Sequence, residues 1–155
     1  MTDLPYRPCA GIMLINAAGH IFTAERINMP GAWQMPQGGI EEGESIEEAA
    51  LRELEEEISV PANAVIVLKQ TADWIPYDLP DHLIEKVWSG RYRGQKQHWT
   101  LMRLEGDESL INLDTEHPEF SRWKWSNPNE LIAEIVPFKR GVYQAVLNEL
   151  LGPAD

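Results

Sequence analysis

Two glutamates, Glu53 and Glu57, carry the strongest chemical signal in this chain. They lie in the segment 38–60, GGIEEGESIEEAALRELEEEISV, which predicts an amphipathic helix ending near Ile58. At roughly 100° per residue, both project within the apolar stripe of that helix. A carboxylate against an apolar core costs several kcal/mol unless it is protonated, paired or coordinated. Hard divalent cations prefer oxygen ligands. The pattern therefore predicts a metal site.

The remaining glutamates of the segment have a simpler interpretation. Glutamate-rich helices are usually solvated faces or ladders of weak ion pairs. We expect this of Glu41, Glu42, Glu47, Glu48 and Glu55. Glu48 also follows Ser45 at the spacing of a capping box, which predicts that Ser45 is the N-cap of the helix.

The segment resembles the Nudix box, a set of glycine, glutamate and arginine positions at fixed spacing. The matching residues are Gly38, Glu44, Arg52, Glu53, Leu54, Glu56, Glu57 and Val60. Ser59 stands where the family has glycine, at a helix end where a left-handed conformation costs other residues about 1 kcal/mol. The resemblance implies an α/β fold, a Nudix-type alpha/beta/alpha sandwich with a mixed β-sheet between helices. It also implies Mg-dependent hydrolysis of a diphosphate linked to another moiety.

Composition agrees with a single enzyme domain, which we place at residues 5–151. The chain has 155 residues, of which 43% are hydrophobic, enough for one core. Its one cysteine, Cys9, cannot form an internal disulfide, and no apolar run is long enough to span a membrane. We therefore expect a cytoplasmic protein without membrane partners. The net charge of -12 argues against generic duplex nucleic-acid binding, which needs a basic surface.

Hydrophobic periodicity and turn residues outline the elements that must position these groups. We predict strands at 9–16, 21–24, 33–35, 64–71, 98–104 and 122–125. We predict further helices at 128–135 and 138–151, and a break in the pattern at 76–80. Strands on both sides of a central helix, with a helix at the end, fit a mixed sheet between helices.

Segments outside the box narrow the resemblance to one branch of the family. These segments are 6–8, 33–39, 94–97, 118–120 and 138–140. They are similar to those of bacterial RNA pyrophosphohydrolases, which in turn resemble the asymmetric diadenosine tetraphosphate hydrolases of plants. This similarity extends over nearly the whole chain.

The resemblance implies a set of metal ligands and a mechanism. The ligands are Gly38, through its carbonyl oxygen, and Glu53, Glu56, Glu57 and Glu119. Taken alone, Glu119 is typical of a surface acid, whereas the family pattern brings it to the metals. Bound Mg, or Mn, lowers the pKa of a water, and Glu53 or Glu119 accepts its proton. Arg52 orients a glutamate by a charge-assisted hydrogen bond.

A second set of residues is expected to bind the substrate. This set comprises Arg7, Arg26, Tyr77, Lys96, Val136, Phe138 and Lys139. Arg7 and Lys96 are candidates for phosphate oxygens, while Arg91 and Arg93 are also compatible with a simple basic loop. Phe138 beside Lys139 suits stacking on a base, although a lone Phe more often packs in a core. Tyr77 fits equally a ring that closes over substrate and one that caps a turn.

Three functions remain open from the sequence. The first is removal of pyrophosphate from 5′-triphosphorylated RNA, and the second is asymmetric hydrolysis of dinucleoside polyphosphates. The third is a non-catalytic Nudix module that binds nucleotides. The histidines lack metal-binding spacing, and no serine or cysteine nucleophile motif is present in the sequence, so hydrolysis by an activated water is favoured.

Overall fold

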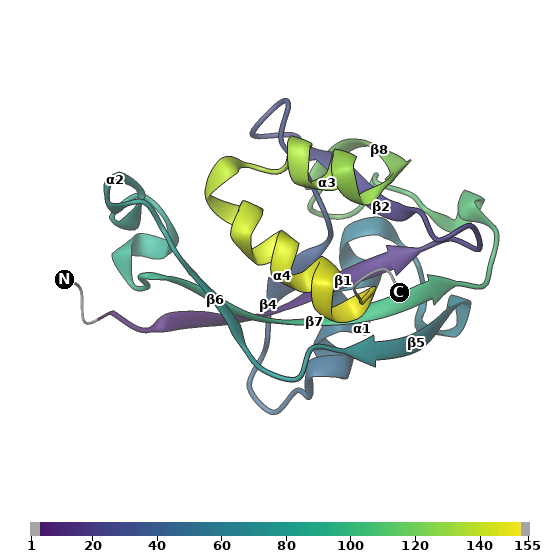
Figure 1. Cartoon of the computed structure of the whole chain (residues 1–155), viewed down its shortest axis with the longest axis horizontal. Coiled ribbons are helices and arrows are strands. Elements are labelled where there is room, and N and C mark those ends of the chain that lie inside the picture. The colour runs from purple at the N-terminus through teal and green to yellow at the C-terminus, as the bar shows by residue number, and fades with distance from the viewer. Residues whose placement is uncertain (1–3, 153–155) are drawn as a thin grey trace.

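A mixed β-sheet between two helical layers forms the body of the molecule (Figure 1). The computed structural model describes residues 4–152. The strands are β1 (Tyr6–Ile15), β2 (Ile21–Arg26), β3 (Trp33–Gln34), β4 (Gln37–Gly39), β5 (Val65–Gln70), β6 (Ile75–Asp78), β7 (Gly94–Leu104) and β8 (Phe120–Ser126). β1 and β7 pair in parallel at the centre, and the other pairs are antiparallel.

The helices cover opposite faces of this sheet. They are α1 (Ile46–Ile58), α2 (Asp81–Ile84), α3 (Pro128–Glu134) and α4 (Arg140–Leu150), with 3₁₀ turns η1 (Ala62–Ala64), η2 (Trp88–Gly90), η3 (Glu108–Leu110) and η4 (Pro137–Lys139). Figure 1 shows α4 in front of the sheet and α1 behind it. Leu54 of α1 packs in one core with Phe22, and Val146 of α4 packs in the other with Trp99. The predicted alpha/beta/alpha sandwich is confirmed.

The partners of the two central strands change along their length. The middle of β1, residues 9–11, pairs with β4, whereas its last residue pairs with β2. Similarly, β7 pairs with β6 along its first half and with β5 along its second. β4 and β6 therefore flank the same end of the β1–β7 pair, and the candidate site lies at that end.

The helix that carries the glutamates begins and ends as its sequence predicts. Ser45 Oγ accepts from the Glu48 amide at 3.0 Å, and Glu48 Oε1 accepts from the Ser45 amide at 2.9 Å. This reciprocal pair is a capping box. At the other end Ser59 has φ 69°, the expected left-handed conformation, and its N–H donates to the Glu55 carbonyl at 2.9 Å.

Several predicted boundaries were wrong; β7, for example, begins at Gly94 and not at residue 98, and three other differences bear on the site. Residues 75–78, where we predicted a break, form edge strand β6, because an edge strand tolerates Pro76. Residues 37–39 form strand β4 on β1, although their glycines are typical of turns. The closing helix starts at Arg140 and not at Phe138, because Pro137 opens the 3₁₀ turn η4 instead. No helix within the described residues is long and apolar enough to cross a membrane.

Candidate metal and polyphosphate site

A cavity of about 1040 Å³ opens where β4, α1, β6 and η4 meet. Glu53, Glu56 and Glu57 of α1 line one side of it, with Gly38 of β4. Its other predicted lining residues are Arg7, Arg26, Tyr77, Glu119, Phe138 and Lys139. The structure thus brings most of the predicted site residues from distant parts of the chain to one cavity.

Glu57 is buried in the cavity wall, with 8% of its surface exposed. Its Oε2 atom is buried and has no hydrogen-bond partner within residues 4–152. Burial raises the pKa of Glu57 well above its usual value, and the charges of Glu53 and Glu119 raise it further. An unpartnered buried carboxylate oxygen among other carboxylates is what a divalent cation would stabilise. The donor set therefore fits a metal site.

Glu53 lies directly against the glycine strand. A Cβ atom built on Gly38 would clash with Cδ of Glu53, so only glycine leaves room for this carboxylate. Burial raises the pKa of Glu53, while its hydrogen bond from Arg52 lowers it. Gly38 therefore allows close approach of a carboxylate to the β4 backbone.

Replacing Gly38 with Ala should lower turnover and leave the fold intact. The added methyl group displaces the Glu53 carboxylate, which is the end of a flexible side chain. We expect kcat to fall about 10- to 100-fold, as for other changes that misplace a metal ligand. Steady-state kinetics and a thermal melt measure the two effects. Gly141→Ala is the matched control, since a Cβ there meets nothing within 4 Å; equal activity of both variants would contradict this role of Gly38.

Arg52 joins the helix to the strand and to the loop before the helix. Its Nε and Nη2 donate to the two oxygens of Glu44 at 2.7 and 2.9 Å, and Nη2 also donates to the Gly39 carbonyl at 2.9 Å. Its Nη1 donates to Glu53 at 2.8 Å and to Glu56 at 3.1 Å. The Arg52 hydrogen bonds lower the pKa of Glu44 to about 2. Arg52 therefore has the contacts needed to orient Glu53, and it is not among the residues that line the cavity.

Glu56 and Glu119 complete the acidic wall at its exposed rim. Glu119 precedes β8 in a loop, and its carbonyl accepts from the Ile27 amide at 3.0 Å. No set of three potential metal ligands already converges on one point among the described residues. Arg52 contacts one oxygen of Glu53 and one oxygen of Glu56, so each carboxylate keeps its second oxygen for a cation.

Opposite the glutamates, aromatic rings and a buried cation form a second wall. The rings of Tyr77 and Phe138 have centroids 5.9 Å apart, and Lys139 Nζ lies 5.6 Å from the Tyr77 ring. Lys139 is 7% exposed. Burial, together with the charge of Arg26, lowers the pKa of Lys139 to about 8. This wall presents stacking surface and positive charge to the same cavity as the carboxylates.

Lys139→Met should stabilise the protein near pH 7 and weaken substrate binding. The folded-state pKa of Lys139, about 8, is below its ordinary value of 10.5, so the buried charge destabilises the fold below pH 8. This penalty fades as pH rises from 8 to 10.5. We expect a gain of about 1–3 kcal/mol in the free energy of unfolding at pH 7, measured by urea denaturation. The exposed Lys86→Met is the control; a gain that grows with pH would contradict this origin.

Two predicted substrate residues lie away from the cavity. Lys96 is not among its lining residues, and its Nζ lies 4.6 Å from the ring of Trp74. The neighbouring Gln95 does line the cavity, because successive residues of a strand point to opposite faces. Val136 is half-buried beside the core under α4 and is also absent from the lining.

Sequence reasoning missed several parts of the lining, among them residues 115–117 and the segment after Tyr77. The segment after Tyr77 contributes Leu79, Leu83, Val87 and Trp88 to the same cavity. A signal was present in the alternation of aromatic and basic residues at 88–93, which suits single-stranded nucleic acid. Its position beside the glutamates follows only from the pairing of β6 with β7.

The fold and the carboxylate-lined cavity define a hydrolase that acts on phosphoric anhydrides. The family model for the NUDIX domain matches residues 5–146, and the chain belongs to the Nudix family.

Curated relatives align over almost the full chain. One is an RNA pyrophosphohydrolase from Roseobacter denitrificans, 56% identical over 146 residues that cover 94% of this chain and 91% of the relative. Another, from Cereibacter sphaeroides, is 54% identical over 145 residues that cover 93% and 90%. Both carry the same name, RNA pyrophosphohydrolase.

Solved structures share the fold at low sequence identity. The E. coli dihydroneopterin triphosphate pyrophosphohydrolase has a TM-score of 0.73 at 18% identity, covering 96% of this chain and 99% of that one. A C. elegans Ap4A hydrolase has a TM-score of 0.65 at 17% identity, covering 94% and 99%. These likenesses concern the fold alone.

Proposed function

We propose that this enzyme removes pyrophosphate from the 5′ end of triphosphorylated RNA and leaves a 5′-monophosphate end. The main supporting observation is that the carboxylates of α1 line the same cavity as the aromatic and basic side chains of Tyr77, Phe138 and Lys139. Such a cavity accommodates a polyphosphate with a base attached to it. The identity of more than half of all aligned residues with two RNA pyrophosphohydrolases supports RNA as the substrate.

Divalent metal ions belong to this proposal. Nudix hydrolases use divalent metals, and one fold relative from Francisella tularensis was solved with a Mn ion. We assign the ligands to Glu53, Glu56, Glu57, Glu119 and the Gly38 carbonyl, with Mg as the preferred ion and Mn as a substitute. When bound, such ions neutralise phosphate charge and lower the pKa of a coordinated water.

The protein's own residues bind and orient the reactants. Lys139 and Arg7 offer cations to the polyphosphate, and Phe138 offers a ring face to a base near the 5′ end. Arg52 and Gly38 hold Glu53 in place, whereas Glu119 is exposed on a loop. We therefore assign to Glu53 the acceptance of the proton from the attacking water, and to Glu119 a place on the far side of the metals.

Dinucleoside polyphosphates are the second candidate substrates. Metal ions, cations and a base-stacking ring serve that reaction equally, and the cavity has room for a second base. A non-catalytic nucleotide-binding module is disfavoured. Burial of the Glu53 and Glu57 carboxylates destabilises the fold, and a protein without catalysis would gain nothing from keeping them.

A competition experiment separates the candidates. Triphosphorylated RNA and diadenosine tetraphosphate are supplied at equal concentration with Mg, and the products of both are quantified. We expect faster loss of the RNA triphosphate, and Lys139→Ala should slow it. Cleavage of the dinucleotide alone would overturn the proposal, and hydrolysis of neither substrate would favour the non-catalytic module.

A further inference from the structure

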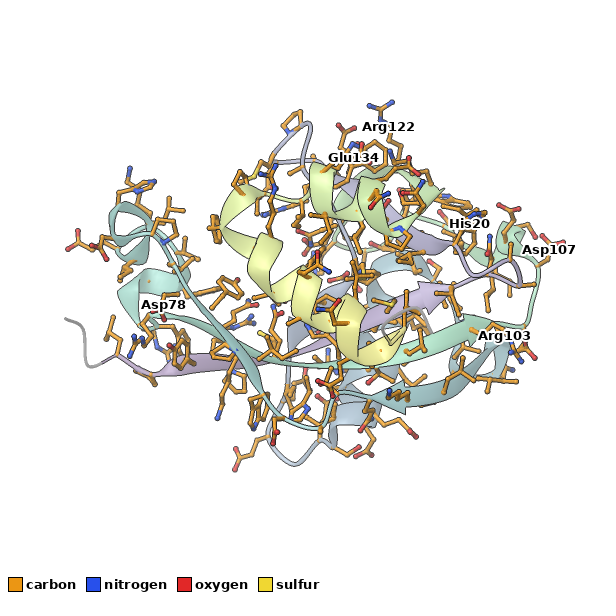
Figure 2. All side chains as sticks on the ribbon, in the orientation of Figure 1. His20, Asp78, Arg103, Asp107, Arg122 and Glu134 are labelled. Atoms are coloured by element: carbon orange, nitrogen blue, oxygen red, sulfur yellow. The ribbon has the colours of Figure 1, made fainter. Side chains whose placement is uncertain are left out.

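The cavity extends past the catalytic wall along the segment that links β6 to β7. Leu83, Val87 and Trp88 of this segment line it together with the glutamates. Its volume of about 1040 Å³ is at the upper end of pockets for single drug-sized ligands, about 300–1000 Å³. Figure 1 shows this segment, with α2, projecting beside the start of β1, and Figure 2 labels Asp78 at this end of the molecule, opposite Arg103 and Asp107. The site therefore has space for more than the reacting triphosphate.

The segment differs in charge from the rest of the chain. Residues 86–96, KVWSGRYRGQK, hold four of the 13 lysines and arginines and no aspartate or glutamate, in a chain of net charge -12. None of the four lines the cavity itself; they lie beyond the point where Trp88 and Gln95 line it. Basic residues interleaved with aromatic ones suit the backbone and bases of a single-stranded nucleic acid.

Contacts between rings and guanidinium groups order this surface. Arg7 Cζ lies 5.5 Å from the Trp88 ring centroid, and the Trp88 and Tyr92 rings meet edge to face at 6.0 Å. Arg91 Cζ lies 5.7 Å from the Tyr92 ring, and within the described residues Arg91 has no ion pair. Arg93 is held by Asp78 at 3.1 Å, so it supports the segment and is not a free cation. Trp88 and Arg91 are therefore the groups available to a ligand.

The backbone at Trp88 is held in an uncommon conformation. Trp88 and Ser89 have φ of 50° and 57°, in the left-handed region that disfavours side chains, and Gly90 follows at 71°. Such residues cost on the order of 1–3 kcal/mol each and cluster at ligand sites. Here the strained turn carries the one tryptophan among the described residues that lines the cavity.

We propose that Trp88, Tyr92 and Arg91 form a subsite for RNA downstream of the 5′ end, with a base on the Trp88 ring and a phosphate at Arg91. This inference rests on the proposed function and deepens it. The subsite makes binding stronger for each added nucleotide that reaches it. A dinucleoside polyphosphate has no phosphodiester beyond its second nucleoside, so the phosphate contact at Arg91 selects RNA over that substrate.

Equilibrium binding of 5′-monophosphorylated RNA tests the subsite without turnover. Single-stranded oligonucleotides of increasing length are titrated into the wild type and Trp88→Ala with Mg. We expect wild-type affinity to rise with length and Trp88→Ala to lose about tenfold for the longer RNAs, with little change for a mononucleotide. Trp74→Ala is the matched control, because Trp74 also lies under a cation, Lys96, but outside the cavity. Wild-type affinity that is independent of length, or equal losses in both variants, would overturn the inference.

Salt dependence and turnover give independent outcomes. Arg91→Gln should reduce the slope of log Kd against log salt by about 0.7, the value for one phosphate contact of a single strand. An unchanged slope contradicts the assignment of Arg91. Turnover of triphosphorylated RNA by the wild type is measured in parallel. Its absence refutes the proposed function, whereas normal turnover without a length effect refutes the subsite alone.

Discussion

Glu53→Gln should abolish most of the hydrolysis of triphosphorylated RNA and leave the fold unchanged. The substitution removes a metal ligand and the assigned proton acceptor, but it preserves the shape of the side chain beside Gly38. Loss of general base catalysis alone lowers rates about 10²- to 10⁴-fold, and we expect kcat to fall at least that far. Formation of 5′-monophosphate ends at saturating Mg and RNA measures the effect.

The control for this variant is Glu47→Gln in the first turn of the same helix. Glu47 is exposed and does not line the cavity, so its substitution should leave kcat within a factor of two or so of the wild type. Circular dichroism and thermal melts of both variants establish that the fold is retained. Wild-type activity of Glu53→Gln would remove Glu53 from the mechanism.

Glu57→Gln should stabilise the metal-free protein and remove most of its response to Mg. Burial raises the pKa of Glu57 above its ordinary value of 4.5, so the folded state binds a proton more tightly than the unfolded state. The stability that this proton contributes is complete below pH 4.5 and is lost as pH rises through the raised pKa. The amide carries no charge and escapes this loss. We expect a gain of about 1–3 kcal/mol for the metal-free variant at neutral pH.

Mg should stabilise the wild type much more than it stabilises Glu57→Gln. A ligand at 100 times its Kd stabilises the folded state by about 2.7 kcal/mol, so Mg should raise the Tm of the wild type. In Glu57→Gln this rise should be small, because the buried ligand oxygen is replaced. Melting curves with Mg and with EDTA, at neutral and acidic pH, measure both effects. A variant that is less stable without metal and equally stabilised by Mg would contradict the role of Glu57 as a ligand.

Features that depend on local sequence were predictable. The capping box of Ser45 and Glu48 and the left-handed Ser59 follow from short-range hydrogen bonding and backbone geometry, and the structure confirms them. The inward position of Glu53 and Glu57 follows from helical periodicity. These features account for the acidic wall of the site.

Features that depend on pairing between distant strands were not predictable. Tyr77 enters the cavity because β6 pairs with β7, and that pairing involves residues about 20 positions apart in sequence, Tyr77 with Gln95. The alternation of β7 brings Gln95 to the cavity and directs Lys96 to Trp74. The position of Trp88 beside the active wall depends on the same pairing. The sequence of residues 76–97 alone does not predict the register in which β6 pairs with β7.

The most direct test of the account is the conversion of RNA ends by the purified protein. RNA with a labelled 5′-triphosphate is incubated with Mg or with EDTA, and the 5′-monophosphate ends and released phosphates are quantified together. The account predicts Mg-dependent formation of 5′-monophosphate ends in step with released pyrophosphate, or with two phosphates released stepwise. Triphosphate ends that stay intact with Mg, in protein that is folded and binds the metal, would contradict it.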